Sequence, residues 1–231
     1  MHDFGKFVYL DMPKTGSTFV SSFLKACTVC PERRFAKHQW MRQEYDPQVF
    51  YFVSIREPIK AYSSLCRYGL DKKGEVFQSL KLAGKDFVYD DFNHFLEYMM
   101  DHRNARTIAS DYAPELAEEM GFMTWRFLRM SLQYPYKKFK AAVINGETAE
   151  DLEKMKITNH EIKNENLRED LLHLAENVLP DCFDLGAART FLASAKRQNT
   201  SLTKSDEISR ITPSNHEQIQ RKERVLLKRY R

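Results

Sequence analysis

Hydrophobic positions along the chain form the same kind of pattern in two separate segments. Short apolar runs at residues 7–10 and 49–55 predict buried strands, and the second run is apolar on both faces, as in a central parallel strand. After each run, apolar residues recur at helical spacing, up to Cys27 in the first segment and Cys66 in the second. Each segment therefore predicts a strand, a loop and a helix.

The remainder of the chain is mostly helical in pattern. Alternating strands and helices predict a single α/β domain spanning residues 1–231, with a central parallel sheet flanked by helices. The other expected elements are a helix over 90–100, a long helix or a pair broken at Gly121 over 112–132, strands at 141–144 and 160–163, helices beginning near Asn166, Asp184 and Thr212, the last running to about Tyr230, and a polar loop over 196–206.

Composition narrows the functional classes. A chain of 231 residues with 42% hydrophobic residues can bury a full-size core. Its net charge of +4 suits an anionic small ligand and is too weak to indicate nucleic acid. We see no run of 18 apolar residues and no apolar leader, so we expect a cytoplasmic protein without a membrane span; the oligomeric state stays open.

Two of the four cysteines, Cys27 and Cys30, form a C-x-x-C pair. A redox motif of this kind favours a helix N-terminus, and this pair follows the end of a helical pattern. A zinc site needs a second pair of ligands. We therefore expect reduced thiols, and the role of the pair stays open.

The segment Asp11–Thr18 has the composition of an anion cradle. It joins a buried strand to a helix, so backbone amides at the helix N-terminus lack intrahelical partners. Gly16 lets the backbone approach an anion, Lys14 adds charge, and Ser17 and Thr18 add hydroxyl donors. The alternative is an ordinary turn with a serine or threonine N-cap.

This segment resembles the 5′-phosphosulfate loop, P-K-x-G-[ST]-[ST], of the superfamily of sulfotransferases that use 3′-phosphoadenosine 5′-phosphosulfate (PAPS), in its bacterial type. Residues 55–64 resemble the family's 3′-phosphate motif, an arginine at a strand end with proline two and serine eight residues later. The resemblance implies a fold like that of the nucleotide triphosphatases. It also implies that the donor is bound by Lys14, Thr15, Gly16, Ser17, Thr18, Arg56 and Ser64.

The chemistry of Arg56 agrees with that role, because a guanidinium offers a planar fork of donors to a phosphate dianion. The alternative is a strand-end arginine paired with Glu57. Weaker similarities at residues 121–128, 165–171 and 199–201 extend the resemblance over nearly the whole chain.

His38 lies between the two motifs, where many members of the superfamily carry the histidine that deprotonates the acceptor. A pKa near neutrality suits a general base. The alternative is that His38 is a surface or packing histidine. In that case Glu44 or Asp46 is the candidate base. The basic tail over 221–231 is most simply a solvated helix face, and the other interpretation is contact with the 3′-phosphate or an acidic acceptor.

The resemblance implies transfer of a sulfuryl group from PAPS, without a metal, to a hydroxyl or amine of a carbohydrate, a lipid head group or a small alcohol or phenol. Lys14 would stabilise the leaving group, adenosine 3′,5′-bisphosphate. One rival is a small-molecule kinase that uses ATP and magnesium, although the lysine precedes the glycine here, unlike the order G-x-x-x-x-G-K-[ST]. The other rival is a non-catalytic nucleotide-binding relative. The acceptor is not predicted.

Overall fold

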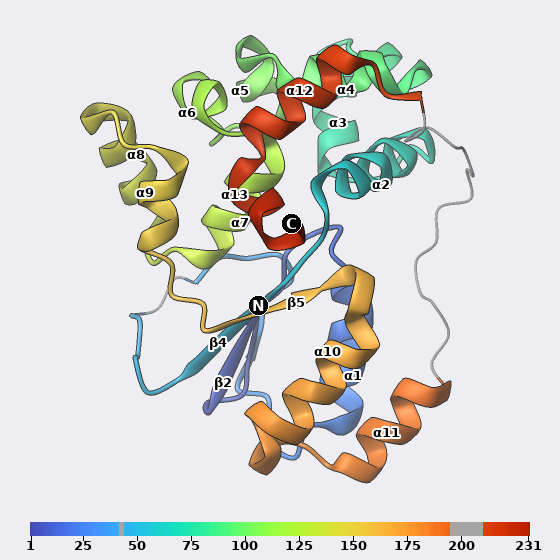
Figure 1. Ribbon diagram of the computed structural model, residues 1–231, viewed down its shortest axis with the longest axis vertical. Coiled ribbons are helices and arrows are strands. Elements are labelled where there is room, and N and C mark those ends of the chain that lie inside the picture. The colour runs from blue at the N-terminus through green and yellow to red at the C-terminus, as the bar shows by residue number, and fades with distance from the viewer. Residues whose placement is uncertain (42–43, 195–209) are drawn as a thin grey trace. The chain divides into compact units, whose positions relative to one another are not determined.

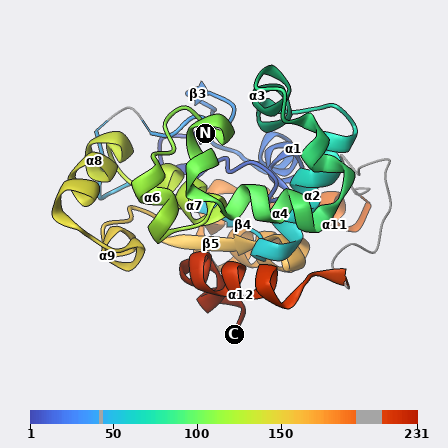
Figure 2. The same cartoon turned by 90° about the horizontal axis from the view of Figure 1, so that it is seen from above.

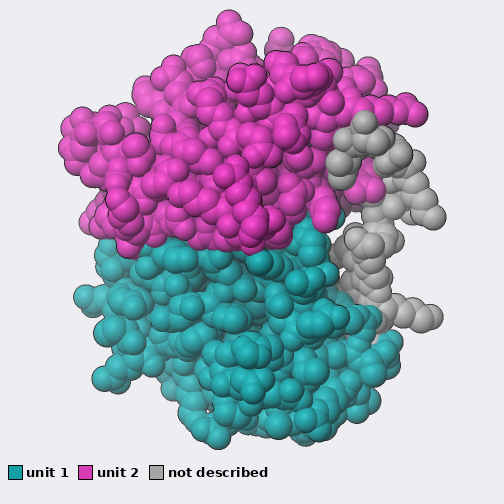
Figure 3. Space-filling model, viewed as in Figure 1, with its two compact units in different colours: residues 1–56, 130–134, 156–200 teal, residues 57–129, 135–155, 201–231 magenta. Residues whose placement is uncertain are grey.

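The computed structural model describes residues 1–41, 44–194 and 210–231, and the chain divides into two compact units (Figure 3). We call them the sheet unit and the helical unit. The sheet unit comprises residues 1–56, 130–134 and 156–200, and the helical unit comprises residues 57–129, 135–155 and 201–231.

The sheet unit contains a mixed five-stranded sheet in the order β3-β1-β2-β4-β5. β2, β4 and β5 are parallel, whereas β1 pairs antiparallel with both β2 and β3. Figures 1 and 2 show β4 and β5 side by side. The strands are β1 (His2–Asp3), β2 (Phe7–Leu10), β3 (Arg34–Phe35), β4 (Phe50–Ile55) and β5 (His160–Lys163).

The α/β class is confirmed, but the expectation of a parallel sheet is wrong at one edge. β1 and β2 are joined by a short turn through Gly5, which has a φ of 79°. Such a short connection can join only antiparallel neighbours, because a parallel pair needs a long crossover. The predicted strands at 7–10, 49–55 and 160–163 are present within one residue.

Three helices cover one face of this sheet: α1 (Ser17–Cys27), α10 (Leu167–His173) and α11 (Leu185–Ser194) (Figure 1). Alternate strand residues point into the shared core because successive side chains in a strand face opposite sides. The strand residues in this core are Phe7, Tyr9, Phe52 and Ile162.

The helical unit is built around stacked aromatic side chains. Tyr112, Phe122 and Trp125 contact one another, and the Trp125 ring also stacks on Phe139. Its helices are α2 (Pro58–Leu70), α3 (Glu75–Leu82), α4 (Phe92–Met100), α5 (Ala105–Ile108), α6 (Pro114–Glu119), α7 (Phe122–Ser131, whose last two residues are assigned to the sheet unit), α8 (Pro135–Asn145), α9 (Ala149–Lys154), α12 (Pro213–Lys222) and α13 (Arg224–Leu227).

One predicted strand is wrong. Residues 141–144 lie inside α8, and two of their apolar side chains, Val143 and Ile144, are 38% and 72% exposed. A short apolar run does not by itself distinguish a strand from a helix. The predicted break at Gly121 is confirmed, since α6 ends and α7 begins on either side of it.

The C-terminal helix ends at Lys222, short of Tyr230, because Glu223 is drawn into the core. Its carboxylate accepts hydrogen bonds from the Tyr62 hydroxyl and from the backbone amides of Met123 and Thr124. These amides lie in the first turn of α7, so a residue of the C-terminal segment caps that helix. Burial raises the pKa of Glu223.

Within the described parts of the chain, no helix is long and apolar enough to cross a membrane. The expected polar loop at 196–206 and the similarity at 199–201 fall outside the described residues.

Candidate functional site

Three parallel strands of the sheet unit end at the same edge. β2 is followed by Asp11, β4 by Arg56 and β5 by Asn164, and Ile55 of β4 lies opposite Lys163 of β5. Ligands in open α/β sheets bind beyond the carboxyl ends of the strands, so this edge is the candidate site.

The predicted anion loop lies at this edge and turns sharply into α1. Lys14 and Gly16 both have left-handed backbone conformations, with φ of 69° and 84°. The Gly16 carbonyl accepts from the amides of Phe19 and Val20. As the N-cap residue, Gly16 offers no side-chain cap, and the first turn of α1 carries no acidic residue. The helix dipole there favours an anion.

Gly16 also has no room for a side chain. A Cβ at this position would lie 2.5 Å from Leu167 Cδ1 and 2.6 Å from Asn164 Nδ2. The chain that follows β5 is therefore packed against the anion loop. The sequence indicated the glycine but not these neighbours, because nothing in the residues alone pairs the two segments.

The Thr15 side chain is buried and holds the loop from inside. Its hydroxyl donates to the Met12 carbonyl oxygen at 2.7 Å and lies 2.6 Å from Ser54 Oγ, which in turn lies 2.6 Å from the Tyr9 hydroxyl. This chain of hydroxyls ties the loop to β2 and β4. A role for Thr15 in ligand binding would therefore use its backbone amide.

The two hydroxyls at the start of α1 lie in different environments. Ser17 is buried and hydrogen-bonds to the Asp11 carboxylate. Thr18 is exposed. Of the two predicted hydroxyl donors, Thr18 is therefore the one exposed at the N-terminus of the helix. The Ser17 hydroxyl is used within the loop, where it binds Asp11.

His38 is bound to the first residue of the loop. Its Nδ1 lies 3.1 Å from the Asp11 carbonyl oxygen and 3.2 Å from Asp11 Oδ1, and its amide donates to Oδ2 at 3.3 Å. Burial alone would raise the pKa of the Asp11 carboxyl. Hydrogen bonding and charge from His38, with smaller contributions from the charge of the N-terminal ammonium group and from Ser17, outweigh burial and lower this pKa to about 2.

Asp11 was not among the predicted site residues. The available signal was its place at the end of a buried strand, directly before the loop. The two alternative bases, Glu44 and Asp46, are exposed. The Asp46 carboxylate accepts from the Gln48 amide at 2.9 Å.

Arg56 brings the second motif to the first. Its Nη1 donates to the Lys14 carbonyl oxygen at 3.4 Å. The carboxylate of the next residue, Glu57, accepts from the amides of Ile59 and Lys60 and so caps α2. In the alternative interpretation Arg56 pairs with Glu57. The Glu57 carboxylate already accepts these two hydrogen bonds, which compete with such a pairing.

Ser64 lies on α2 in the helical unit and is half-buried. The other predicted donor-binding residues belong to the sheet unit. The contact of Ser64 with a 3′-phosphate stays a prediction.

Lys163 adds a cation that the sequence prediction missed. It is the last residue of β5, is half-buried, and donates its backbone amide to Asp170 Oδ2 at 2.7 Å. The signal was available, because a lysine ends the predicted strand at 160–163.

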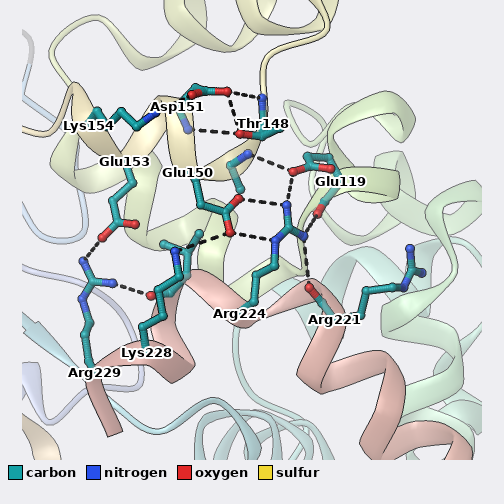
Figure 4. A network of polar contacts seen from close by, with 12 residues as sticks. Glu119, Thr148, Glu150, Asp151, Glu153, Lys154, Arg221, Arg224, Lys228 and Arg229 are labelled. Atoms are coloured by element: carbon teal, nitrogen blue, oxygen red, sulfur yellow. Dashed lines mark hydrogen bonds and ion pairs between the residues drawn. The ribbon is translucent and has the colours of Figure 1, made fainter. Parts of the chain in front are cut away.

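Two arginines of the basic tail, Arg224 and Arg229, bind carboxylates within the helical unit (Figure 4). Arg224 pairs with Glu119 and with Glu150, and Arg229 pairs with Glu153 at 2.7 Å. The tail is therefore more than a solvated face. Its predicted contact with a 3′-phosphate or an acidic acceptor stays untested.

Lys222 of the same tail is buried. Its ammonium group donates to the carbonyl oxygens of Met100 and Ala117, near the C-terminal ends of α4 and α6. A cation at the C-terminal end of a helix stabilises the unpaired carbonyls there. Lys222 thus holds the tail against two helices.

Among the residues that the structure describes, no three histidine, cysteine or acidic side chains gather as a metal site. In comparisons with known proteins, no family model, no curated protein and no solved structure matches this chain. The functional conclusion therefore depends on the two motifs and on the geometry at the sheet edge.

Proposed function

We propose that this protein binds PAPS and transfers its sulfuryl group to a hydroxyl or an amine of a small-molecule, carbohydrate or lipid acceptor. One observation carries the proposal. The loop that follows β2 is hydrogen-bonded both to the strand-end Arg56, through Lys14, and to the imidazole of His38, through Asp11. Hydrogen bonds thereby connect the loop proposed as the cradle to the side chains proposed as the 3′-phosphate ligand and the base.

The residues present fit the charged groups of such a donor. The start of α1 has an uncapped, positive N-terminus with Lys14 beside it, which suits the phosphosulfate end. Asp11, the acid at the start of the loop, already interacts with His38 and Ser17. Arg56 would bind the 3′-phosphate. When bound, PAPS supplies an activated sulfuryl group.

His38 acts as the base in this account. Both neighbours of its Nδ1 are oxygen acceptors of Asp11, so Nδ1 carries the hydrogen and Nε2 keeps a lone pair. Nε2 accepts the proton of the acceptor hydroxyl or amine, and the Asp11 carboxylate stabilises the resulting imidazolium. The Lys14 ammonium group offsets negative charge that develops on the leaving side.

The proposal is tested by an acceptor screen with isotope-labelled PAPS. Carbohydrates, lipid head groups, phenols, simple alcohols and amines are each incubated with the protein, and products are examined by mass spectrometry for an added labelled sulfuryl group. We expect one class to be labelled by wild-type protein and not by His38→Ala. Phosphorylated products with ATP and magnesium would instead identify a kinase, and nucleotide binding with no product in any class would identify a non-catalytic relative.

A further inference from the structure

The segment that follows α1 is paired with the segment that precedes α11. Thr28 and Phe183 form an antiparallel bridge, and the Val29 amide donates to the Cys182 carbonyl oxygen at 3.0 Å. This pairing brings Cys30 beside Cys182, although 152 positions separate them in the sequence. All of these residues belong to the sheet unit.

The two thiols are neighbours in the fold. The Cys30 side chain lies close enough to raise the pKa of the Cys182 thiol, and both cysteines are reduced. Cys182 is only 3% exposed, whereas Cys30 is half-buried and packs against the core. Cys27, the sequence neighbour in the C-x-x-C pair, is 1% exposed on the core face of α1.

We propose that Cys30 and Cys182 form a reversible disulfide when the protein meets a low-molecular-weight disulfide such as oxidised glutathione. The proposal concerns a modification site outside the candidate active site. The partner of Cys30 is then the distant Cys182 and not Cys27, its sequence neighbour in the C-x-x-C pair. A disulfide needs Cα atoms roughly 4.4–6.8 Å apart. The bridge between Thr28 and Phe183 pairs the two cysteine-bearing segments, and opposed Cα atoms of antiparallel strands lie about 4.5–5.5 Å apart.

The order of the exchange follows from exposure. The Cys30 thiolate is the accessible sulfur, so it attacks the small disulfide, breaks that S–S bond and releases one small thiolate. Burial and the contact with Cys30 raise the pKa of the Cys182 thiol to about 11. Cys182 therefore stays protonated until it attacks the mixed disulfide at Cys30, and its proton passes to the second departing thiolate. Two protein thiols are oxidised and one small disulfide is reduced to two thiols.

The bond would tie the C-terminal end of α1 to the turn before α11. The anion loop lies at the opposite end of α1, which has 11 residues and so spans about 16 Å. The disulfide should therefore stabilise the sheet unit by closing a long loop without entering the candidate site. Its test is thereby independent of the sulfotransferase proposal.

The experiment uses the full chain, equilibrated in buffers of reduced and oxidised glutathione and then treated with a thiol-blocking reagent. Peptide mass spectrometry should find Cys30 linked to Cys182, two hydrogen atoms lighter than the reduced pair. The unfolding temperature should rise by about 5 °C or more, and the rise should disappear on reduction.

Matched variants locate the bond. Cys27→Ser and Cys66→Ser should keep the cross-link and the thermal shift, and Cys30→Ser should lose both. Because Cys30 is half-buried, its serine variant is expected to fold. A link between Cys27 and Cys30, glutathione retained on Cys30 without a cross-link, or four unreacted thiols under oxidising buffer would each overturn the proposal.

Discussion

His38 Nδ1 lies between two acceptors of the same residue, the carbonyl oxygen of Asp11 at 3.1 Å and its carboxylate Oδ1 at 3.2 Å. This arrangement determines the tautomer, because a nitrogen facing two acceptors must carry the hydrogen. Asp11 is also the residue at which β2 passes into the anion loop. The imidazole is therefore oriented by the element that would bind the donor.

The first prediction concerns turnover. His38→Ala should lower sulfuryl transfer by about 10²–10⁴, the usual contribution of a positioned base, and should leave nucleotide affinity nearly unchanged. Asp11→Asn should also lower turnover, because it acts through His38 as a positioning residue.

The double variant tests whether these two residues act as one unit. Combining Asp11→Asn with His38→Ala should lower turnover no further than His38→Ala alone. Independent, multiplying losses would mean that Asp11 does not work through the histidine. Full activity in His38→Ala would direct the search for a base to Glu44 or Asp46.

The second prediction concerns acid stability. The pKa of Asp11 falls from its ordinary 3.8 to about 2 in the folded protein. A depressed carboxyl pKa contributes stability that is present above the unfolded value and is lost as the pH falls through the folded value. A difference of this size corresponds to about 2 kcal/mol.

Urea unfolding of wild type and Asp11→Asn between pH 7 and pH 2 measures this contribution. The gap in unfolding free energy should be widest near pH 7 and should narrow by about 2 kcal/mol between pH 4 and pH 2. A gap that does not change with pH would show that the carboxylate charge is not stabilised by its neighbours.

The third prediction uses Gly16. Gly16→Ala should abolish nucleotide binding and destabilise the sheet unit, because its Cβ would collide with Leu167 and Asn164. Gly84→Ala is the matched control, since Gly84 has a φ of 65° and no atom within 4 Å of an added Cβ. Gly84→Ala should lower the free energy of unfolding by about 1–2 kcal/mol, because alanine disfavours the left-handed backbone conformation. It should keep the nucleotide affinity of the wild type. Equal behaviour of the two variants would refute the close approach at Gly16.

The fourth prediction concerns Glu223. Its Oε1 accepts from Tyr62 and Met123 and its Oε2 from Thr124, so Glu223→Gln sets an amide NH₂ against buried donors. Denaturant unfolding should show a loss of about 1–3 kcal/mol or more. Glu217→Gln, at an exposed position of α12, should change stability by less than about 0.5 kcal/mol. A Glu223→Gln variant as stable as that control would contradict the capping role.

Local pattern was sufficient for much of the fold. The strands at β2, β4 and β5 and the break at Gly121 follow from runs, spacing and turn residues in the sequence. The antiparallel edge was missed because β1 has only two residues, too few for a periodicity. The helix at 141–144 was missed because Val143 and Ile144 are apolar yet exposed, which local pattern does not reveal.

The candidate site also contains residues that the sequence predicted and residues that it missed. The loop with Lys14 and Gly16 and the strand end at Arg56 could be predicted because each lies within one contiguous motif. Asp11 as the partner of His38 and Lys163 at the neighbouring strand end were missed. Those relationships depend on how strands are ordered and how a distant loop returns to the sheet, and one sequence without contacts does not specify them.

The most direct test of the central claim is calorimetric titration with adenosine 3′,5′-bisphosphate in the presence of EDTA. We expect wild-type protein to bind it without metal. Arg56→Ala should weaken this nucleotide by about 10-fold or more, because a charge-assisted contact contributes roughly 1.5–3 kcal/mol, and should affect adenosine 5′-monophosphate far less. Absence of metal-free binding in the wild type, together with binding of ATP and magnesium, would contradict the account.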